Sequence, residues 1–124
     1  MQLDLVTMVE NYFAAVDGKD LTATLAFFAP DAVLTIATFD LGNRGRDKQI
    51  REMFERLFER YDRIWHGNFE HVVEAPGRIA TRFDVENRTY DGQSYRKRNA
   101  NFFYLQEAHF SVVHVYMSGD NALR

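Results

Sequence analysis

The chain has 124 residues, of which 46% are hydrophobic and 27% are charged, as expected for one ordinary globular domain. Its formal net charge of -3 argues against a nucleic-acid partner, because proteins that bind phosphate backbones concentrate positive charge on one face. The sequence contains no cysteine, which excludes a disulfide framework, a thiolate nucleophile and a cysteine-based zinc site.

The first ten residues carry acids and no long apolar run, so we expect neither a signal peptide nor a membrane-spanning segment there. Together with the absence of cysteine, this favours a cytoplasmic protein. The chain shows no internal repeat, low-complexity tract or linker, and a single domain over residues 1–124 is predicted.

The first half of the chain predicts two helices and a strand. Apolar residues at helical spacing indicate a helix over Leu3 to Val16, which Gly18 would end. A second short helix is expected from Asp20, which can cap it, through Phe28. The β-branched run Val33 to Phe39 then predicts a short strand.

The next segment, residues 40–47, contains two glycines and an asparagine and is predicted to be a loop. The clearest helical pattern follows it. Apolar residues from Ile50 to Trp65 keep helical spacing for four turns, and charged residues occupy the opposite face. We therefore expect a third, one-sided helix there.

From His66 onward the hydrophobic period changes to two, which indicates strands. Helices followed by a meander of strands form an α+β fold, in which we expect the first and third helices to cover the concave face of a curved antiparallel sheet. The predicted strands are Asn68 to Glu74, Ile79 to Tyr90, Ser94 to Gln106 and Phe110 to Met117.

Several short motifs occur in an order that resembles the NTF2-like superfamily, and more narrowly its SnoaL-like branch. The resemblance covers nearly the whole chain, and residues 107–110 depart from it, with Glu-Ala-His-Phe in place of the usual Asp-Gly-Lys-Ile turn. It implies a cone-shaped α+β barrel in which three helices close an apolar pocket. The motifs are the helix end ENYFAAVDGKDL, the turn FAPDA, WHGN at residues 65–68, Asp91-Gly92 and the closing YMSG.

This superfamily hosts isomerases, dehydratases, cyclases, epoxide hydrolases and proteins without catalysis, so the fold alone does not define a function. Aromatic residues make up 15% of the chain, which suits a pocket with aromatic walls. The residues expected to line that pocket are Ile36, Phe54, Phe58, Trp65, Phe83, Phe103 and Val115.

Asp17 and His66 are the first candidate catalytic residues. Asp17 continues the row of Val9 and Phe13 at i+4 spacing and can face inward, and an acid at a helix C-terminus opposes the macrodipole unless a cation compensates it. In scytalone dehydratase and lindane dehydrochlorinase, which the chain resembles, an Asp at this position holds a proton-abstracting His at the position of His66. In the alternative interpretation, Asp17 belongs to a turn, His66 caps the third helix, and the two do not meet.

Tyr12 and Asn101 form a second candidate set. The resemblance to ketosteroid isomerase places them where two donors stabilise a developing oxyanion, and both side chains can donate. Tyr12 could equally be a core residue, and a buried Asn101 could be a structural hydrogen-bonding residue. The same resemblance puts apolar Ile36 and Val115 where some relatives carry acids, and puts the dehydratase's second histidine near Asn87.

The remaining histidines do not have metal-binding spacing. Neither His66 with His71 nor His109 with His114 stands at i+4 on a helix or i+2 on a strand, and no HExxH motif exists. We therefore expect no metal and no cofactor.

The predicted strands also carry charged faces, whose arginines we expect to pair with Asp84 and Glu86 or to serve an interface. Because the outer face of the sheet often forms a dimer in relatives, a homodimer through the sheet is expected.

The sequence thus predicts a cofactor-independent lyase or isomerase that removes a proton from a small, mostly apolar molecule. In this hypothesis His66 is the base, Asp17 orients it, and Tyr12 and Asn101 polarise the substrate. The alternative is a binding module that holds a small hydrophobic ligand without turning it over, which the apolar Ile36 and Val115 favour.

Overall fold

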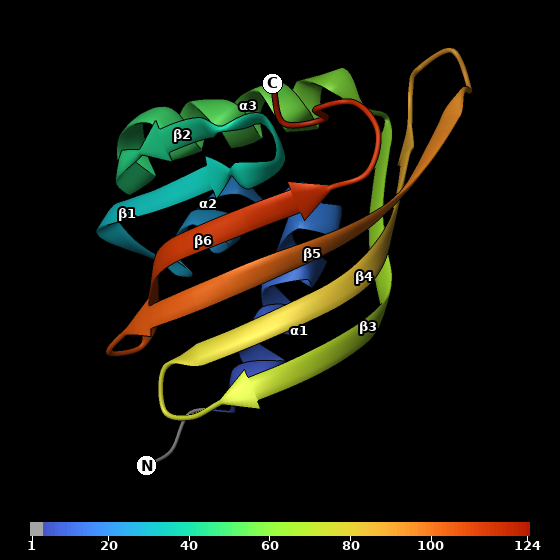
Figure 1. Cartoon of the computed structure of the whole chain (residues 1–124). Helices are drawn as coiled ribbons and strands as arrows, with labels where there is room; N and C mark the ends of the chain where they lie inside the picture. Colours follow the sequence, from blue (N-terminus) through green and yellow to red (C-terminus); the bar gives the residue numbers. More distant parts are fainter. Residues whose placement is uncertain (1–3) are drawn as a thin grey trace.

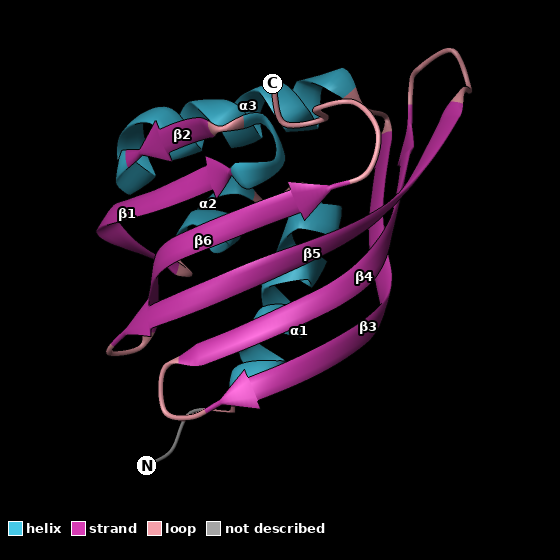
Figure 2. Ribbon diagram, viewed as in Figure 1, coloured by secondary structure: helices cyan, strands magenta, loops and turns pink. Residues whose placement is uncertain are grey.

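The computed structural model describes residues 4–124, so the predicted helix start at Leu3 lies outside the described part. The chain forms an α+β fold of three helices and one sheet (Figures 1 and 2). Its elements are α1 (Leu5–Asp17), α2 (Leu21–Leu25), β1 (Phe28–Ile36), a 3-10 turn (Ala37–Phe39), β2 (Leu41–Arg44), a π-helical turn (Gly45–Ile50), α3 (Arg51–Arg60), β3 (Arg63–Glu74), β4 (Arg78–Arg88), β5 (Ser94–Gln106) and β6 (His109–Met117).

The sheet has six strands in the order β2-β1-β6-β5-β4-β3. The strands from β3 to β6 form the predicted antiparallel meander, whereas β1 pairs with β6 in parallel and β2 pairs with β1 in antiparallel. The sheet is therefore mixed and unclosed. Figure 2 shows that the helices lie on one face of the sheet, with α1 behind the lower strands and α3 beside β2 and β1.

Aromatic rings fill the space between the helices and the sheet. Tyr12 of α1 lies at the centre of this core, and Phe54 of α3 is 2% exposed, as the prediction for α1 and α3 requires. Edge-on aromatic pairs of this kind each contribute about 0.5–1.5 kcal/mol beyond the burial of their area. The rings around Tyr12, with centroids 5.0–6.4 Å away, are Phe13, Phe27, Phe28, Phe54, Phe103 and Phe110.

Three predicted boundaries were wrong. The third helix ends at Arg60 rather than Trp65, because Tyr61 has extended dihedral angles and Asp62 N–H donates to the Arg88 carbonyl, which begins the pairing of β3 with β4. The predicted loop at residues 40–47 contains the short edge strand β2, whose largely exposed side chains give no hydrophobic pattern. The second helix is also shorter than predicted and leads directly into β1 at Phe28.

A bulge in β3 decides which side chains face α1. The register of β3 on β4 shifts between Gly67 and Glu70, and Asn68 has a positive φ of 54°. His66 pairs with Val85 and His71 with Thr81, so the six residues 66–71 on β3 oppose the five residues 81–85 on β4. The extra residue reverses the side-chain alternation, and His66 and His71 therefore both face the helix side.

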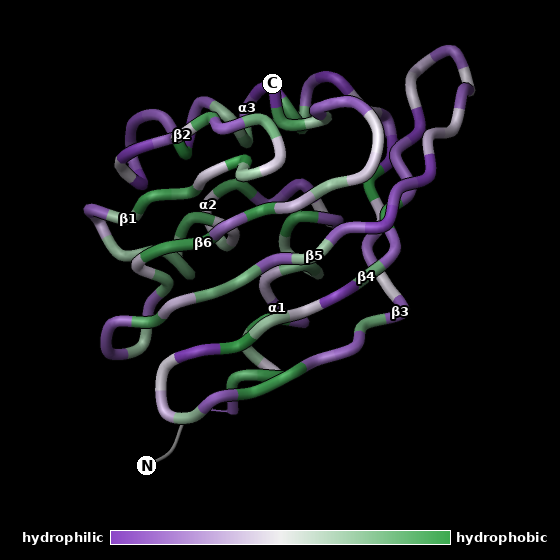
Figure 3. Tube along the Cα trace, viewed as in Figure 1, coloured by the Kyte–Doolittle hydropathy of each residue, from purple (hydrophilic) through white to green (hydrophobic). Residues whose placement is uncertain are grey.

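The surface of the sheet carries the predicted ion pairs. Arg98 Nε lies 3.7 Å from Asp84 Oδ1, and Arg96 Nε lies 3.4 Å from Glu86 Oε2. Figure 3 shows the hydrophilic colour of the β4–β5 hairpin, which extends beyond the sheet. None of the helices within residues 4–124 has the length and apolar character needed to cross a bilayer.

Candidate functional site

Asp17 and His66 are in direct contact where α1 ends and β3 begins. His66 Nδ1 lies 2.5 Å from Asp17 Oδ1, and the His66 backbone N–H donates to Asp17 Oδ2 at 2.9 Å. Both side chains are largely buried, with exposed fractions of 11% for His66 and 23% for Asp17. The predicted contact is therefore present, and the alternative in which the two residues do not meet is wrong.

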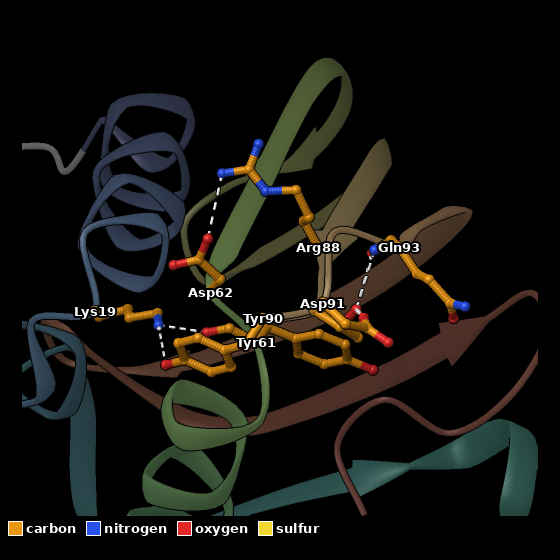
Figure 4. A network of polar contacts seen from close by, with 8 residues as sticks. Lys19, Tyr61, Asp62, Arg88, Tyr90, Asp91 and Gln93 are labelled. Carbon is orange, nitrogen blue, oxygen red and sulfur yellow. Dashed lines mark hydrogen bonds and ion pairs between the residues drawn. The ribbon is translucent and has the colours of Figure 1, made fainter.

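A polar network near this contact fixes the end of α1 against the segment before β3 (Figure 4). Lys19, two residues beyond Asp17, donates through Nζ to the Tyr61 carbonyl, and its Nζ lies 3.5 Å from the Tyr90 hydroxyl. Arg88 Nη2 reaches Asp62 Oδ2 at 3.4 Å. These contacts bring α1, the end of α3 and the β4–β5 hairpin together around the residues that precede His66.

The contact with Asp17 defines the orientation of the His66 ring. The carboxylate holds Nδ1, and within residues 4–124 the other ring nitrogen, Nε2, has no hydrogen-bond partner. The ring packs against Phe13 and Phe83, whose centroids are 4.7 and 5.6 Å away and which also contact each other at 4.6 Å. A carboxylate on Nδ1 favours the tautomer with a bare Nε2, so His66 can accept a proton through that atom.

His66 lines a cavity of about 50 Å³ between α1, α3 and the sheet. A buried water needs roughly 10–15 Å³ of such space, so the cavity has room for a few water molecules and a larger ligand requires some wall to move. The predicted site residues Tyr12, Phe54, Phe83, Asn101 and Val115 also line it, whereas Asp17 lies behind His66. The other lining residues are Phe13, Val16, Leu34, Met53, Leu57, Ile64, Val85, Asn87, Lys97, Asn99, Met117, Ala122 and Leu123.

Four residues predicted to line the pocket lie outside it. Trp65 alternates with Ile64 and His66 and faces away from the cavity, where its ring covers Gly67. Phe103 is buried against Phe110, with ring centroids 4.7 Å apart. Ile36 is buried at the end of β1, and half-buried Phe58 packs on the Phe54 ring at 5.9 Å.

Tyr12 and Asn101 are polar residues that line the cavity. Burial raises the pKa of the Tyr12 hydroxyl above its ordinary value, so this group stays protonated and can donate a hydrogen bond. The Asn101 Oδ1 atom is buried without a hydrogen-bond partner among the described residues. An unpartnered buried amide is costly in a closed core, which makes Asn101 a group that a ligand can satisfy.

Three further polar residues line the cavity and were not predicted as site residues. Asn87 of β4 and Asn99 of β5 each bury an unpartnered Oδ1, and Lys97 of β5 is 9% exposed. Desolvation lowers the pKa of Lys97 below its ordinary value, and the charge of Asp120 opposes this shift. Alternate residues of a strand face the same side, so residues 97, 99 and 101 lie on one face of β5. The expectation that Asn101 faces inward could therefore have been extended to Lys97 and Asn99.

His71 forms a second carboxylate contact but lies outside the cavity. Its Nε2 lies 2.7 Å from Glu10 Oε2 and its Nδ1 lies 2.9 Å from Thr81 Oγ1, so both ring nitrogens are occupied. His114 lies 2.6 Å from Thr35 Oγ1 through its Nδ1 atom. Within residues 4–124 no three His, Asp or Glu side chains are grouped so that they could hold a metal ion.

The family model of the SnoaL-like domain matches residues 9–108 of this chain. Because this match spans most of the chain, the protein belongs to the SnoaL-like family. No curated protein matches the sequence.

Solved structures share the fold at low sequence identity. A protein from Xanthomonas campestris pv. campestris, named as a putative polyketide cyclase, has a TM-score of 0.81 and 20% identity over 90% of this chain and 87% of that chain. An NTF2-like protein from Anabaena variabilis has a TM-score of 0.79 and 17% identity over 94% of this chain and 87% of that chain. At such identities the likeness shows the NTF2-like fold, not the activity.

Proposed function

We propose that this protein is a lyase or isomerase that abstracts a proton from a small, mostly apolar molecule bound in the cavity. The observation that carries the proposal is the contact between Asp17 and His66, a residue of the cavity wall whose Nε2 has no hydrogen-bond partner within residues 4–124. The aromatic lining suits an apolar substrate, and the SnoaL-like family with its cyclase-named and isomerase-named structural neighbours is consistent with proton-transfer chemistry.

The proposed first step breaks a C–H bond next to a carbonyl. The proton moves to His66 Nε2, and the electron pair of the bond becomes delocalised onto the carbonyl oxygen. The Tyr12 hydroxyl and the Asn101 amide, turned to present its N–H, donate to that oxygen. Return of the proton to another carbon gives an isomerase, and loss of a group from the neighbouring carbon gives a lyase.

Deuterium exchange at carbon tests this proposal without knowledge of the natural substrate. We expect the protein to accelerate exchange of the acidic methylene protons of 2-tetralone in D₂O, followed by NMR, and His66→Ala to lose this acceleration while still binding the ketone. His109→Ala, which changes an exposed histidine, is the matched control. Equal exchange by wild type and His66→Ala would overturn the proposal.

The second candidate function is a binding module that holds an apolar ligand without turnover. Val115 in the cavity wall and buried Ile36 favour it, because these positions carry no group that can move a proton. Binding of 2-tetralone by the wild type without any acceleration of exchange would support this function instead.

We also propose a cytoplasmic homodimer that forms through the outer face of the sheet. Phe102 and Tyr116 are 41% and 46% exposed on neighbouring strands, and their rings meet edge to face at 5.8 Å. Tyr104 lies on the same face, under the guanidinium of Arg78. Tyr90 lies in the β4–β5 hairpin, where its hydroxyl is 3.5 Å from Lys19 Nζ.

A further inference from the structure

Residues 118–124, here called the C-terminal strap, cover one end of the cavity. Ala122 and Leu123 of the strap are part of the cavity wall. Two cations hold the strap by its main-chain carbonyls: Arg60 Nη1 donates to Ala122 at 2.7 Å, and Lys97 Nζ donates to Ser118 at 2.9 Å and also to Asp120. Figure 1 shows the strap, in red, beside α3.

Lys97 lies in the same row of the sheet as His66. His66 pairs with Val85 on β4, and Val85 pairs with Lys97 on β5, so one residue separates the two across the cavity floor. Strands spaced 4.7–4.9 Å apart place the two backbones about 10 Å from each other, and the concave curvature brings the side chains closer. One small molecule can therefore reach both His66 and Lys97.

The Lys97 ammonium has no carboxylate partner within 4 Å among the described residues. Its hydrogen bonds go to neutral carbonyls of the strap, and three N–H donors leave one free. A charged oxygen is a stronger acceptor than a neutral carbonyl, so an anion can compete for this site.

The polar residues around Lys97 give this end of the cavity a different character from the aromatic end. Asn99 and Asn101 occupy the next two inward positions of β5, and Asn87 of β4 lies diagonally opposite Lys97. Each buries an unpartnered Oδ1. An asparagine amide can present oxygen or N–H, so these side chains can bind hydroxyl groups or oxyanions beside the ammonium.

Beyond the strap lies an open groove of about 510 Å³. Lys97 and Ala122 line both the groove and the cavity, so the strap separates the two spaces. The groove also contains Arg60, Arg96 and Arg124, with Asp120 as its one acid. This surplus of positive charge would attract an anion to the place where movement of the strap opens the cavity.

We propose that Lys97 binds a carboxylate or equivalent anionic oxygen of the molecule in the cavity, which enters from the groove by displacing the strap from Lys97. The inference rests on the proposed function, since His66 acts on the other end of the same molecule. It defines the substrate class as small aromatic or apolar acids rather than neutral molecules.

Phenylacetate and phenylacetamide, which differ in charge but hardly in shape, are the probes for this proposal. In NMR titrations we expect the wild type to bind phenylacetate at least about tenfold more tightly than phenylacetamide. The side-chain ¹³Cε resonance of Lys97 should shift with the same dissociation constant. Lys97→Met should lose the preference, and Lys97→Arg should keep most of it.

The wild-type comparison decides the proposal even if Lys97→Met fails to fold. Equal affinity for the two probes, no binding of either up to about 20 mM, or a preference that survives in folded Lys97→Met would overturn it. His66→Ala should retain the preference, because charge recognition does not require the base. Exchange by His66→Ala at the wild-type rate, with an intact carboxylate preference, would therefore count against His66 as the base and not against Lys97.

Discussion

His66 and His71 make matching contacts with carboxylates of α1, but only His66 lines the cavity. Glu10 and Asp17 are two helical turns apart, and the bulge in β3 directs both histidines toward them. His71 has Thr81 on its second nitrogen, whereas Nε2 of His66 has no described partner. The Glu10–His71 contact joins α1 to β3 and occupies the imidazole. The Asp17–His66 contact also joins these elements but leaves His66 Nε2 available to accept a proton.

This difference predicts opposite outcomes for two otherwise similar substitutions. Asp17→Asn should reduce catalysed exchange of 2-tetralone about 100-fold or more, because the neutral amide no longer stabilises the imidazolium or fixes its tautomer. Glu10→Gln should leave exchange unchanged. Urea unfolding of both variants should show that each remains folded, with a loss of about 1 kcal/mol or less for the exposed Glu10 contact. Comparable loss of exchange in both variants would contradict the assignment of Asp17.

The sequence predicted much of this site because its signals are local. The i+4 row of α1 places Asp17 inward, and the resemblance aligns His66 with a catalytic position. Lys97, Asn87 and Asn99 were missed because they resemble residues of an exposed strand face in sequence. Lys97 donates its hydrogen bonds to the strap, which is distant in the chain and has no hydrophobic pattern.

Among the elements of the fold, β3 carries the Trp65 ring over Gly67, beside the bulge, and leaves no room for a Cβ there unless the ring moves. A Cβ there would lie 2.2 Å from Cζ2 of the Trp65 ring, closer than any side-chain contact permits. Gly67→Ala should therefore destabilise the protein by about 1–3 kcal/mol. Gly42→Ala on edge strand β2, where a Cβ would meet nothing within 4 Å, should stay within about 0.5 kcal/mol.

Chemical denaturation of the two glycine variants measures this difference. If Gly67→Ala proved as stable as Gly42→Ala, the packing of Trp65 over the bulge would be wrong.

The meander and α1 were predictable because periodicity reports burial on one face. The end of α3 was not, because Tyr61, Ile64 and Trp65 continue the helical spacing while strand pairing with Arg88 ends the helix.

At the scale of the whole molecule, the exposed aromatic residues of the outer sheet face predict self-association. Sedimentation at about 100 µM should show a dimer for the wild type. Phe102→Asp should be a monomer, because a carboxylate in the centre of an apolar contact loses its hydration. Phe39→Asp, which changes a comparably exposed aromatic in the 3-10 turn, should remain dimeric. A monomeric wild type at this concentration would contradict the interface.

The proposed function requires that Asp17 holds His66 so that Nε2 is available to a molecule in the cavity. The most direct measurement is ¹⁵N NMR of the histidine side chains at neutral pH, with and without 2-tetralone. We expect His66 to be protonated at Nδ1 and bare at Nε2, and 2-tetralone to shift the His66 Nε2 resonance but not the ring nitrogens of His71. A proton on Nε2 with Nδ1 bare, or a His66 resonance that does not respond to the ketone, would contradict it.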